Sequence, residues 1–131
     1  MPKTTSFDVS ARYVELKVTT AAKTATKSTA WNIGQAILEE LQVLWSPGHV
    51  ALTGIRLMVG NVALLPWNQP TTFLVGDNER RVFEVNYHVT NPLTIVTQNN
   101  DTFAHTHYFV AMLRDVPLAS DVPRPVVPIV S

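Results

Sequence analysis

Residues 80–89, with the sequence RRVFEVNYHV, decide the fold class. Polar or exposed positions alternate with apolar ones along this stretch: Val82, Glu84, Asn86 and His88 against Phe83, Val85, Tyr87 and Val89. A period of two places successive side chains on opposite faces of a β-strand, whereas a helix requires a period near 3.6. We therefore expect a strand here, with Phe83, Val85 and Tyr87 facing a core.

Further strands are predicted on both sides of this stretch. Residues 11–20 alternate in the same way, with Val14, Leu16 and Val18 on one face. Residues 50–59 and 62–65 flank the turn dipeptide Gly60-Asn61, which predicts a hairpin. Further strands are also expected within 71–75 and 93–98, and a last long strand within 102–113.

Two segments are less regular. Residues 33–45 carry apolar side chains at helical spacing (Ile33, Ile37, Leu41, Leu44), but Leu41, Val43 and Trp45 alternate as in a strand. Helix and strand both remain open for 33–44, and we favour a strand over the second half. Residues 19–30 are small and polar, and we expect a connector or part of an arm there.

The pattern of about seven or eight short strands predicts an all-β protein, an antiparallel β-sandwich of jelly-roll-like type. A chain of 131 residues is the size of one domain. We expect an N-terminal arm over 1–30 with one strand at 11–20, a sandwich body over 31–114 and an extended proline-rich arm over 115–131.

Composition excludes several classes of protein. The chain is 46% hydrophobic and 15% charged and has no cysteine, so its stability must come from packing rather than disulfides. It contains no apolar run of membrane-spanning length and no signal-peptide core, so we expect no membrane partner and synthesis in a cytoplasm. The basic residues before residue 30 are interleaved with threonine and alanine without aromatic neighbours, which favours protein docking over nucleic-acid binding; they are Lys3, Arg12, Lys17, Lys23 and Lys27.

The middle of the chain resembles a known family. The segments are WSPGH (45–49), VALTGIRL (50–57), LLPW (64–67), FLVGDNE (73–79) and NND with a histidine four residues later (99–105). In this order they are similar to small β-sandwich virion structural proteins of tailed bacteriophages, over about residues 40–114. The resemblance implies a virion component, such as a capsid decoration protein, and transfers no functional residue.

The histidines are the best candidates for chemistry. His105 and His107 are two residues apart on a predicted strand, so both imidazoles project from one face and could share a metal ion, with Asp101 nearby. A zinc site commonly needs three or four ligands, so His49 or His88 would have to join them. The alternative is that these histidines are exposed or lie in an interface, and we expect no cofactor.

No sequence motif indicates catalysis. The chain lacks a nucleophile elbow, a zinc-protease motif and a glycine-rich phosphate loop, so we predict that it is not an enzyme and keep a metal-dependent hydrolase as an alternative. Asp77, Glu79 and Asp101 fall at turns, where carboxylates usually accept hydrogen bonds from backbone amides. Trp45 and Trp67 could form a sugar-stacking platform, although packing is the preferred interpretation for Trp67.

The C-terminal residues indicate a partner. Residues 115–131 are too apolar to remain free in water and contain prolines that forbid a helix. The predicted interface residues are Val116, Leu118, Val122, Pro123, Pro125, Val126, Val127, Pro128, Ile129 and Val130. In a strand, Pro123 and Pro125 remove N–H donors from one edge only. The arm can therefore add one strand to a partner's sheet without further strands pairing on its other edge to form a fibre.

The expected function is therefore that of a capsid decoration, or cement, protein of a virion assembled in the host cytoplasm. Its partners would be the major capsid protein or another virion protein, and other copies of itself, more as a trimer than as a dimer. The alternatives are a tail or neck component, a receptor- or glycan-binding module, and the hydrolase named above.

Overall fold

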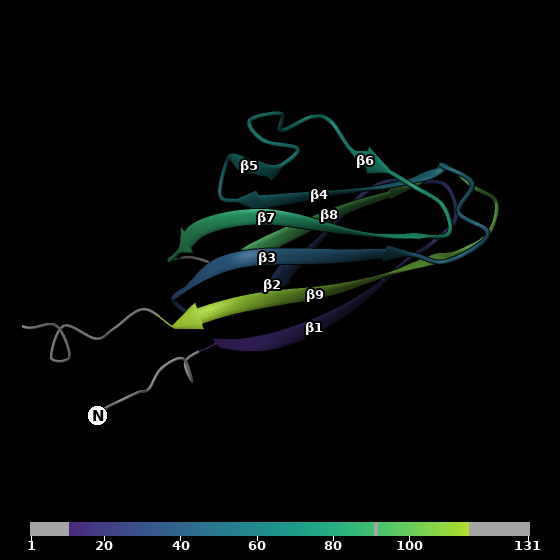
Figure 1. The fold of residues 1–131 in the computed structure, drawn as a ribbon. Helices are drawn as coiled ribbons and strands as arrows, with labels where there is room; N and C mark the ends of the chain where they lie inside the picture. Colours follow the sequence, from purple (N-terminus) through teal and green to yellow (C-terminus); the bar gives the residue numbers. More distant parts are fainter. Residues whose placement is uncertain (1–10, 91, 116–131) are drawn as a thin grey trace, which may run out of the picture.

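Residues 79–89 form a strand whose side chains alternate between core and solvent, as their period of two predicts. It is one of nine strands in a computed structural model that describes residues 11–90 and 92–115 (Figure 1). The strands are β1 (Ala11–Thr20), β2 (Thr24–Trp31), β3 (Ala36–Trp45), β4 (Thr53–Val59), β5 (Val62–Leu65), β6 (Leu74–Val75), β7 (Glu79–Val89), β8 (Leu93–Asn99) and β9 (His105–Asp115). The described part of the chain has no helix of the length and apolarity that a membrane span requires.

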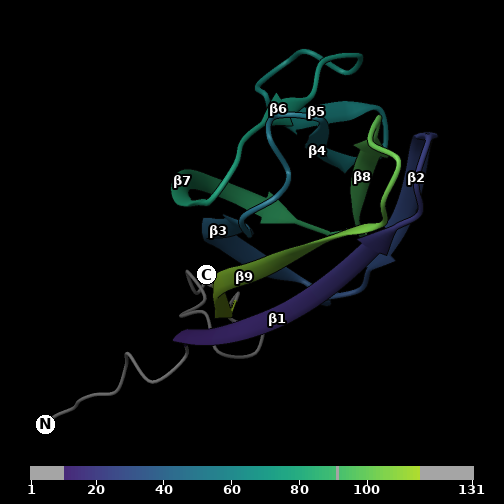
Figure 2. The ribbon, with the colours of Figure 1, turned by 90° about the vertical axis from the view of Figure 1, so that its right-hand side faces the viewer.

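The strands form two antiparallel sheets packed face to face, which confirms the predicted β-sandwich (Figures 1 and 2). One sheet has the order β1-β9-β3-β7, and the other has the order β2-β8-β4-β5 with β6 paired to β4. From β1 to β4, and again from β7 to β9, consecutive strands lie in opposite sheets. The chain therefore crosses repeatedly from one layer to the other.

The core lies between the two inner faces. It includes the fully buried side chains of Leu38, Leu41, Ile55, Leu57, Leu93, Ile95 and Leu113, together with Trp45 and Phe109. Phe83, Val85 and Tyr87 pack against this core from the edge strand β7, so their predicted orientation is confirmed, and they are half-buried because no further strand covers that edge.

The prediction of a connector over 19–30 is wrong, because Thr24–Trp31 form β2. This strand pairs with β8, and its one deeply buried side chain is Trp31 at its end. Backbone pairing and a single anchor are enough for an edge strand that otherwise faces solvent. Since β1 also pairs with β9 over its whole length, residues 11–31 belong to the two sheets, and the predicted arm of residues 1–30 is corrected to that extent.

The ambiguous segment 33–45 contains a strand, β3, and no helix. A bulge between Leu38 and Glu40 shifts its register against both neighbouring strands. A bulge adds one residue to the strand, so the inward positions change from Ala36 and Leu38 to Leu41 and Val43. This extra residue explains why the alternation was clear only in the second half.

Candidate functional site

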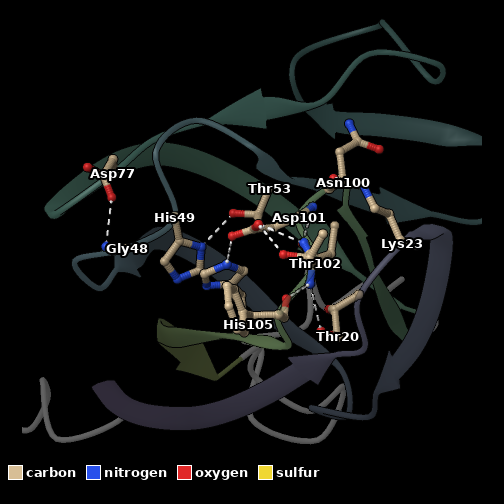
Figure 3. A network of polar contacts seen from close by, with 12 residues as sticks. Thr20, Lys23, Gly48, His49, Thr53, Asp77, Asn100, Asp101, Thr102 and His105 are labelled. Carbon is tan, nitrogen blue, oxygen red and sulfur yellow. Dashed lines mark hydrogen bonds and ion pairs between the residues drawn. The ribbon is translucent and has the colours of Figure 1, made fainter.

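Three histidine side chains gather at one end of the sandwich (Figure 3). His105 and His107 lie on one face at the start of β9, as their spacing predicts, and His49 comes from the loop after β3. The ring centroid of His49 is 4.5 Å from that of His105 and 4.8 Å from that of His107. His88 does not join them, because it is exposed on β7. His49 and His107 are almost completely buried, with exposed fractions of 1% and 0%.

A chain of hydrogen bonds fixes the neutral form of the two buried rings. His49 Nε2 lies 3.2 Å from the carbonyl oxygen of Thr106, so this nitrogen carries the proton and donates it. Its Nδ1 therefore accepts from the Thr53 hydroxyl at 2.5 Å. Having used its hydrogen, Thr53 Oγ1 accepts from His107 Nε2 at 3.1 Å. The pattern assigns an Nε2-protonated tautomer to both rings.

Electrostatics agree with this assignment. The pKa of His107 is lowered to about 3, mainly by burial and in smaller part by the neighbouring His49 and His105. Burial, followed by His105, also lowers the pKa of His49. The Asp101 carboxylate accepts a hydrogen bond of 2.7 Å from His105 Nε2, which is the main reason why the pKa of Asp101 is lowered. The two buried rings are thus uncharged at neutral pH.

The ring nitrogens of the two buried histidines are mostly occupied by hydrogen bonds within the protein. Three of the four ring nitrogens of His49 and His107 contact protein atoms, and His107 Nδ1 is the one without a partner. Across residues 11–90 and 92–115, no group of three or more histidine, cysteine, aspartate or glutamate side chains has the geometry of a metal site. The chemistry that this arrangement supports is structural, because it ties the β3–β4 loop to β9.

The loop that carries His49 turns sharply and is strained. The Leu52 amide donates to the His49 carbonyl oxygen at 2.8 Å, and the two residues between them, Val50 and Ala51, have φ of 48° and 59°. Left-handed backbone is unfavourable for a β-branched residue such as Val50. Strand β4 therefore begins at Thr53 and not at residue 50, where the sequence predicted it.

The acidic turn residues accept backbone hydrogen bonds, as predicted. Asp77 accepts from the Gly48 amide at 3.1 Å and so holds the histidine loop from a second side. Asp101 accepts from the Thr102 amide at 2.7 Å, and Glu79 accepts from the Asp77 amide at 3.2 Å. These carboxylates stabilise turns.

The tryptophans do not form a platform. Trp45 is 0% exposed in the core, which contradicts the sugar-stacking prediction for this pair. Trp67 is 65% exposed, so it does not pack in the core of its own chain either. It lines a pocket of about 270 Å³ with Leu64, Leu65, Glu84, Val85 and Tyr87, which composition alone gave no reason to expect.

The basic residues of the N-terminal region contact protein atoms. Arg12 forms an ion pair of 3.1 Å with Asp115, Lys23 donates to the Asn100 carbonyl at 2.9 Å, and Lys27 donates to the Thr19 carbonyl at 2.6 Å. These contacts favour a role within the fold over phosphate binding.

The described chain begins and ends side by side, at the end opposite the histidines (Figure 1). Ala11 pairs with Arg114 across β1 and β9, and Asp115 pairs with Ala36 on β3. The predicted interface residues between Val116 and Val130 lie outside the described residues.

Comparison with known proteins adds little to these observations. No family model matches the chain, and no curated protein matches it. Among solved structures, the coat protein of Tobacco streak virus is similar, with 12% sequence identity over 95% of this chain and 98% of that chain and a TM-score of 0.42. The functional argument therefore depends on the residues and their geometry.

Proposed function

We propose that this protein is a structural component of a virion, a decoration protein that binds and stabilises the shell of a tailed bacteriophage. The sandwich is the body that sits on the shell, and the terminal segments are arms that bind neighbouring chains. The resemblance of residues 40–114 to virion sandwich proteins supports this role. The strand order supports it as well, because strands that alternate between two packed sheets, here of four and five strands, are expected of a jelly roll.

One observation carries the proposal: both arms start from the same end of one sheet. Ala11 and Arg114 are paired, so the points at which residues 1–10 and 116–131 join the body lie on neighbouring strands. β1 is also an edge strand, and an uncovered edge offers backbone groups to another chain. Two arms beside a free edge form a single docking region, which suits attachment to neighbouring subunits.

The C-terminal arm has the composition that such attachment needs. Its apolar side chains contribute roughly 25 cal/mol for each Å² of apolar surface that they bury. Prolines favour extended conformations, so an arm of this composition would lose less conformational entropy on docking. We infer that the partners are the major capsid protein or another virion protein, together with further copies of this chain, as a trimer rather than a dimer.

The histidine network supports a structural and not a catalytic role. Its buried rings are neutral, and their hydrogen bonds join loop to strand. A general base has to reach a substrate, and neither His49 nor His107 is exposed.

Co-sedimentation with empty shells tests the proposal. The full chain should pellet with shells, and a chain that lacks residues 116–131 should pellet much less while its melting temperature stays nearly the same. A Phe103→Ala variant, altered at a residue that is 71% exposed in the turn between β8 and β9, controls for surface changes away from the docking region. If the shortened chain binds shells fully and its melting temperature falls by several degrees, the arm belongs to its own sandwich and the proposal is wrong.

A further inference from the structure

The pocket beside Trp67 lies where the edges of the two sheets face each other. β7 is the edge strand of one sheet and β5 is the end of the other, and they contribute Val85, Tyr87, Leu64 and Leu65 to the pocket wall. Trp67, just after β5, adds an exposed indole ring. The result is an aromatic and aliphatic pocket of about 270 Å³, which is also lined by Glu84, an exposed residue on the outer face of β7.

The carboxylate is not neutralised by any residue in the described ranges. Glu84 lies directly opposite Glu40 in the β3–β7 register, and like charges in this position repel each other. Arg81 pairs with Glu79 and Arg114 with Glu39. Arg80, four residues before Glu84 on the same face of β7, donates to Gln42 at 3.5 Å. Within residues 11–90 and 92–115 neither Glu40 nor Glu84 forms an ion pair, so the pocket has room for a cation from another segment.

The C-terminal arm contains a segment with matching chemistry. Residues 124–128 read Arg-Pro-Val-Val-Pro, which places one cation before two prolines with two residues between them. Such segments favour the polyproline II conformation, and aromatic-lined grooves bind them because little entropy is lost. An adjacent acidic residue pairs with the arginine and fixes the direction of binding.

We propose that the Trp67 pocket binds residues 124–128 of a neighbouring copy's C-terminal arm. Arg124 pairs with Glu84 beside Glu40, and the prolines pack on Trp67 and Tyr87. The arm–pocket contact thus links one copy to the next. This inference deepens the arm-docking part of the proposed function by naming the surface that receives the arm.

The strand directions favour a neighbouring copy over the same chain. β9 and β7 are both antiparallel to β3, so they run in the same direction, and Asp115 lies in the same row as Val89. The pocket residues Glu84 to Tyr87 precede Val89 on β7. A chain that continues past Asp115 would therefore have to reverse direction to reach the pocket of its own copy. The residue before a proline is disfavoured in helical turns, so this reversal would have to fall within residues 118–123.

Disulfide trapping tests this contact in the full chain, which has no native cysteine. One chain carries Glu84→Cys and a second, size-tagged chain carries Arg124→Cys, and the two are mixed without shells under mild oxidation. The mixed disulfide should form about tenfold faster than with a Phe103→Cys partner, because docking raises the effective concentration of the two thiols. A rate no higher than the Phe103→Cys control overturns the proposal.

A double-cysteine chain with both substitutions distinguishes the origin of the arm. Exchange between copies gives covalent oligomers, whereas a chain bound to its own arm gives a cross-linked monomer, which would overturn the assignment to a neighbour. These cross-linking experiments contain no shells. A failure to cross-link therefore counts against the arm–pocket contact, and a failure to co-sediment counts against the proposed shell binding.

Self-association measured by sedimentation velocity provides a second readout. Trp67→Ala should raise the dissociation constant roughly 10- to 100-fold, as for an aromatic anchor, while Phe103→Ala leaves it unchanged. Glu84→Arg and Arg124→Glu should each raise it about three- to fivefold, and the double reversal should restore it. Equal effects of Trp67→Ala and Phe103→Ala, no rescue by the double reversal, or displacement of the arm by oligosaccharides but not by an Arg-Pro-Val-Val-Pro peptide would overturn the proposal.

Discussion

Acid should destabilise the sandwich through His107. Its ring is 0% exposed, and its pKa falls from 6.5 to about 3 on folding. Between these two values the unfolded chain binds a proton that the folded chain does not, so the free energy of unfolding decreases as the pH falls. At roughly 1.4 kcal/mol for each pH unit, lowering the pH from 7.5 to 4 removes about 3 kcal/mol, a large part of the stability of an ordinary domain.

The groups that face His107 act in the same direction or outside this pH window. His49 from the β3–β4 loop also has a lowered pKa, so its effect has the same sign. The charged or titratable neighbours of His49 are His105 and Asp77, and those of His107 are His49 and His105. The lowered pKa of Asp101 gives stability that is complete above its usual value of 3.8 and is lost only as the pH falls through the lower folded value.

A His107→Gln variant isolates this effect, because the glutamine amide can still donate to Thr53 but takes up no proton. Urea denaturation at pH 7.5, 6, 5 and 4, at one protein concentration, gives the free energy of unfolding of both proteins. The buried Trp31 and Trp45 provide the fluorescence signal. The stability advantage of the wild type should shrink by about 3 kcal/mol between pH 7.5 and pH 4.

The control is His88→Gln, at an exposed position on β7 outside the network, which should keep the pH dependence of the wild type. Parallel curves for the wild type and His107→Gln over this pH range would refute the reasoning. The neutral, buried state of His107 would then not be the source of the acid sensitivity.

Three further predictions concern the backbone and the chain ends. Val50→Asn should raise the free energy of unfolding by about 1 kcal/mol in urea denaturation, because asparagine tolerates the φ of 48° at this position, and an unchanged value would contradict the strain. Gly54→Ala should lower the melting temperature through a loss of about 1–3 kcal/mol, because a Cβ there would lie 2.6 Å from the Phe73 Cβ; unchanged melting would mean that this contact relaxes freely. Deleting residues 1–10 should preserve a cooperative thermal transition in circular dichroism, whereas deleting residues 1–30 should abolish it, because that deletion removes β1 and all of β2 except Trp31. A cooperative transition in the chain that lacks residues 1–30 would show that these strands are dispensable.

The strands that the sequence predicted well are those with one face buried. Residues 79–89 and 11–20 alternate because a sandwich strand has an inner and an outer face, and this requirement is local. β2 escaped prediction because it is an edge strand whose side chains mostly face solvent. The bulge in β3 escaped prediction because the extra residue becomes visible only against the neighbouring strands.

The histidine cluster was predictable in part for the same reason. The spacing of His105 and His107 places both on one face of a strand, which is a local property. Their meeting with His49 depends on register: Trp45 at the end of β3 pairs with His107, so the loop that follows β3 begins beside that ring. Thr53, which joins the two buried rings, gives no sequence signal, because threonine is common in strands for other reasons.

The histidine end and the Trp67 pocket differ in how they respond to substitution. At the histidine end, Asn99 donates to the carbonyl oxygens of Thr20 at 3.0 Å and Phe103 at 2.7 Å, and the hydroxyls of Thr20 and Thr97 lie 2.7 Å apart. A buried polar group that loses its partner costs free energy, so removing one of these groups destabilises the whole fold. Beside the edge strands β5 and β7, Trp67 is exposed and contributes little to the core of its own chain. Variants that separate binding from folding should therefore lie in the Trp67 pocket, whereas acid acts at the histidine end and would remove binding only by unfolding the body.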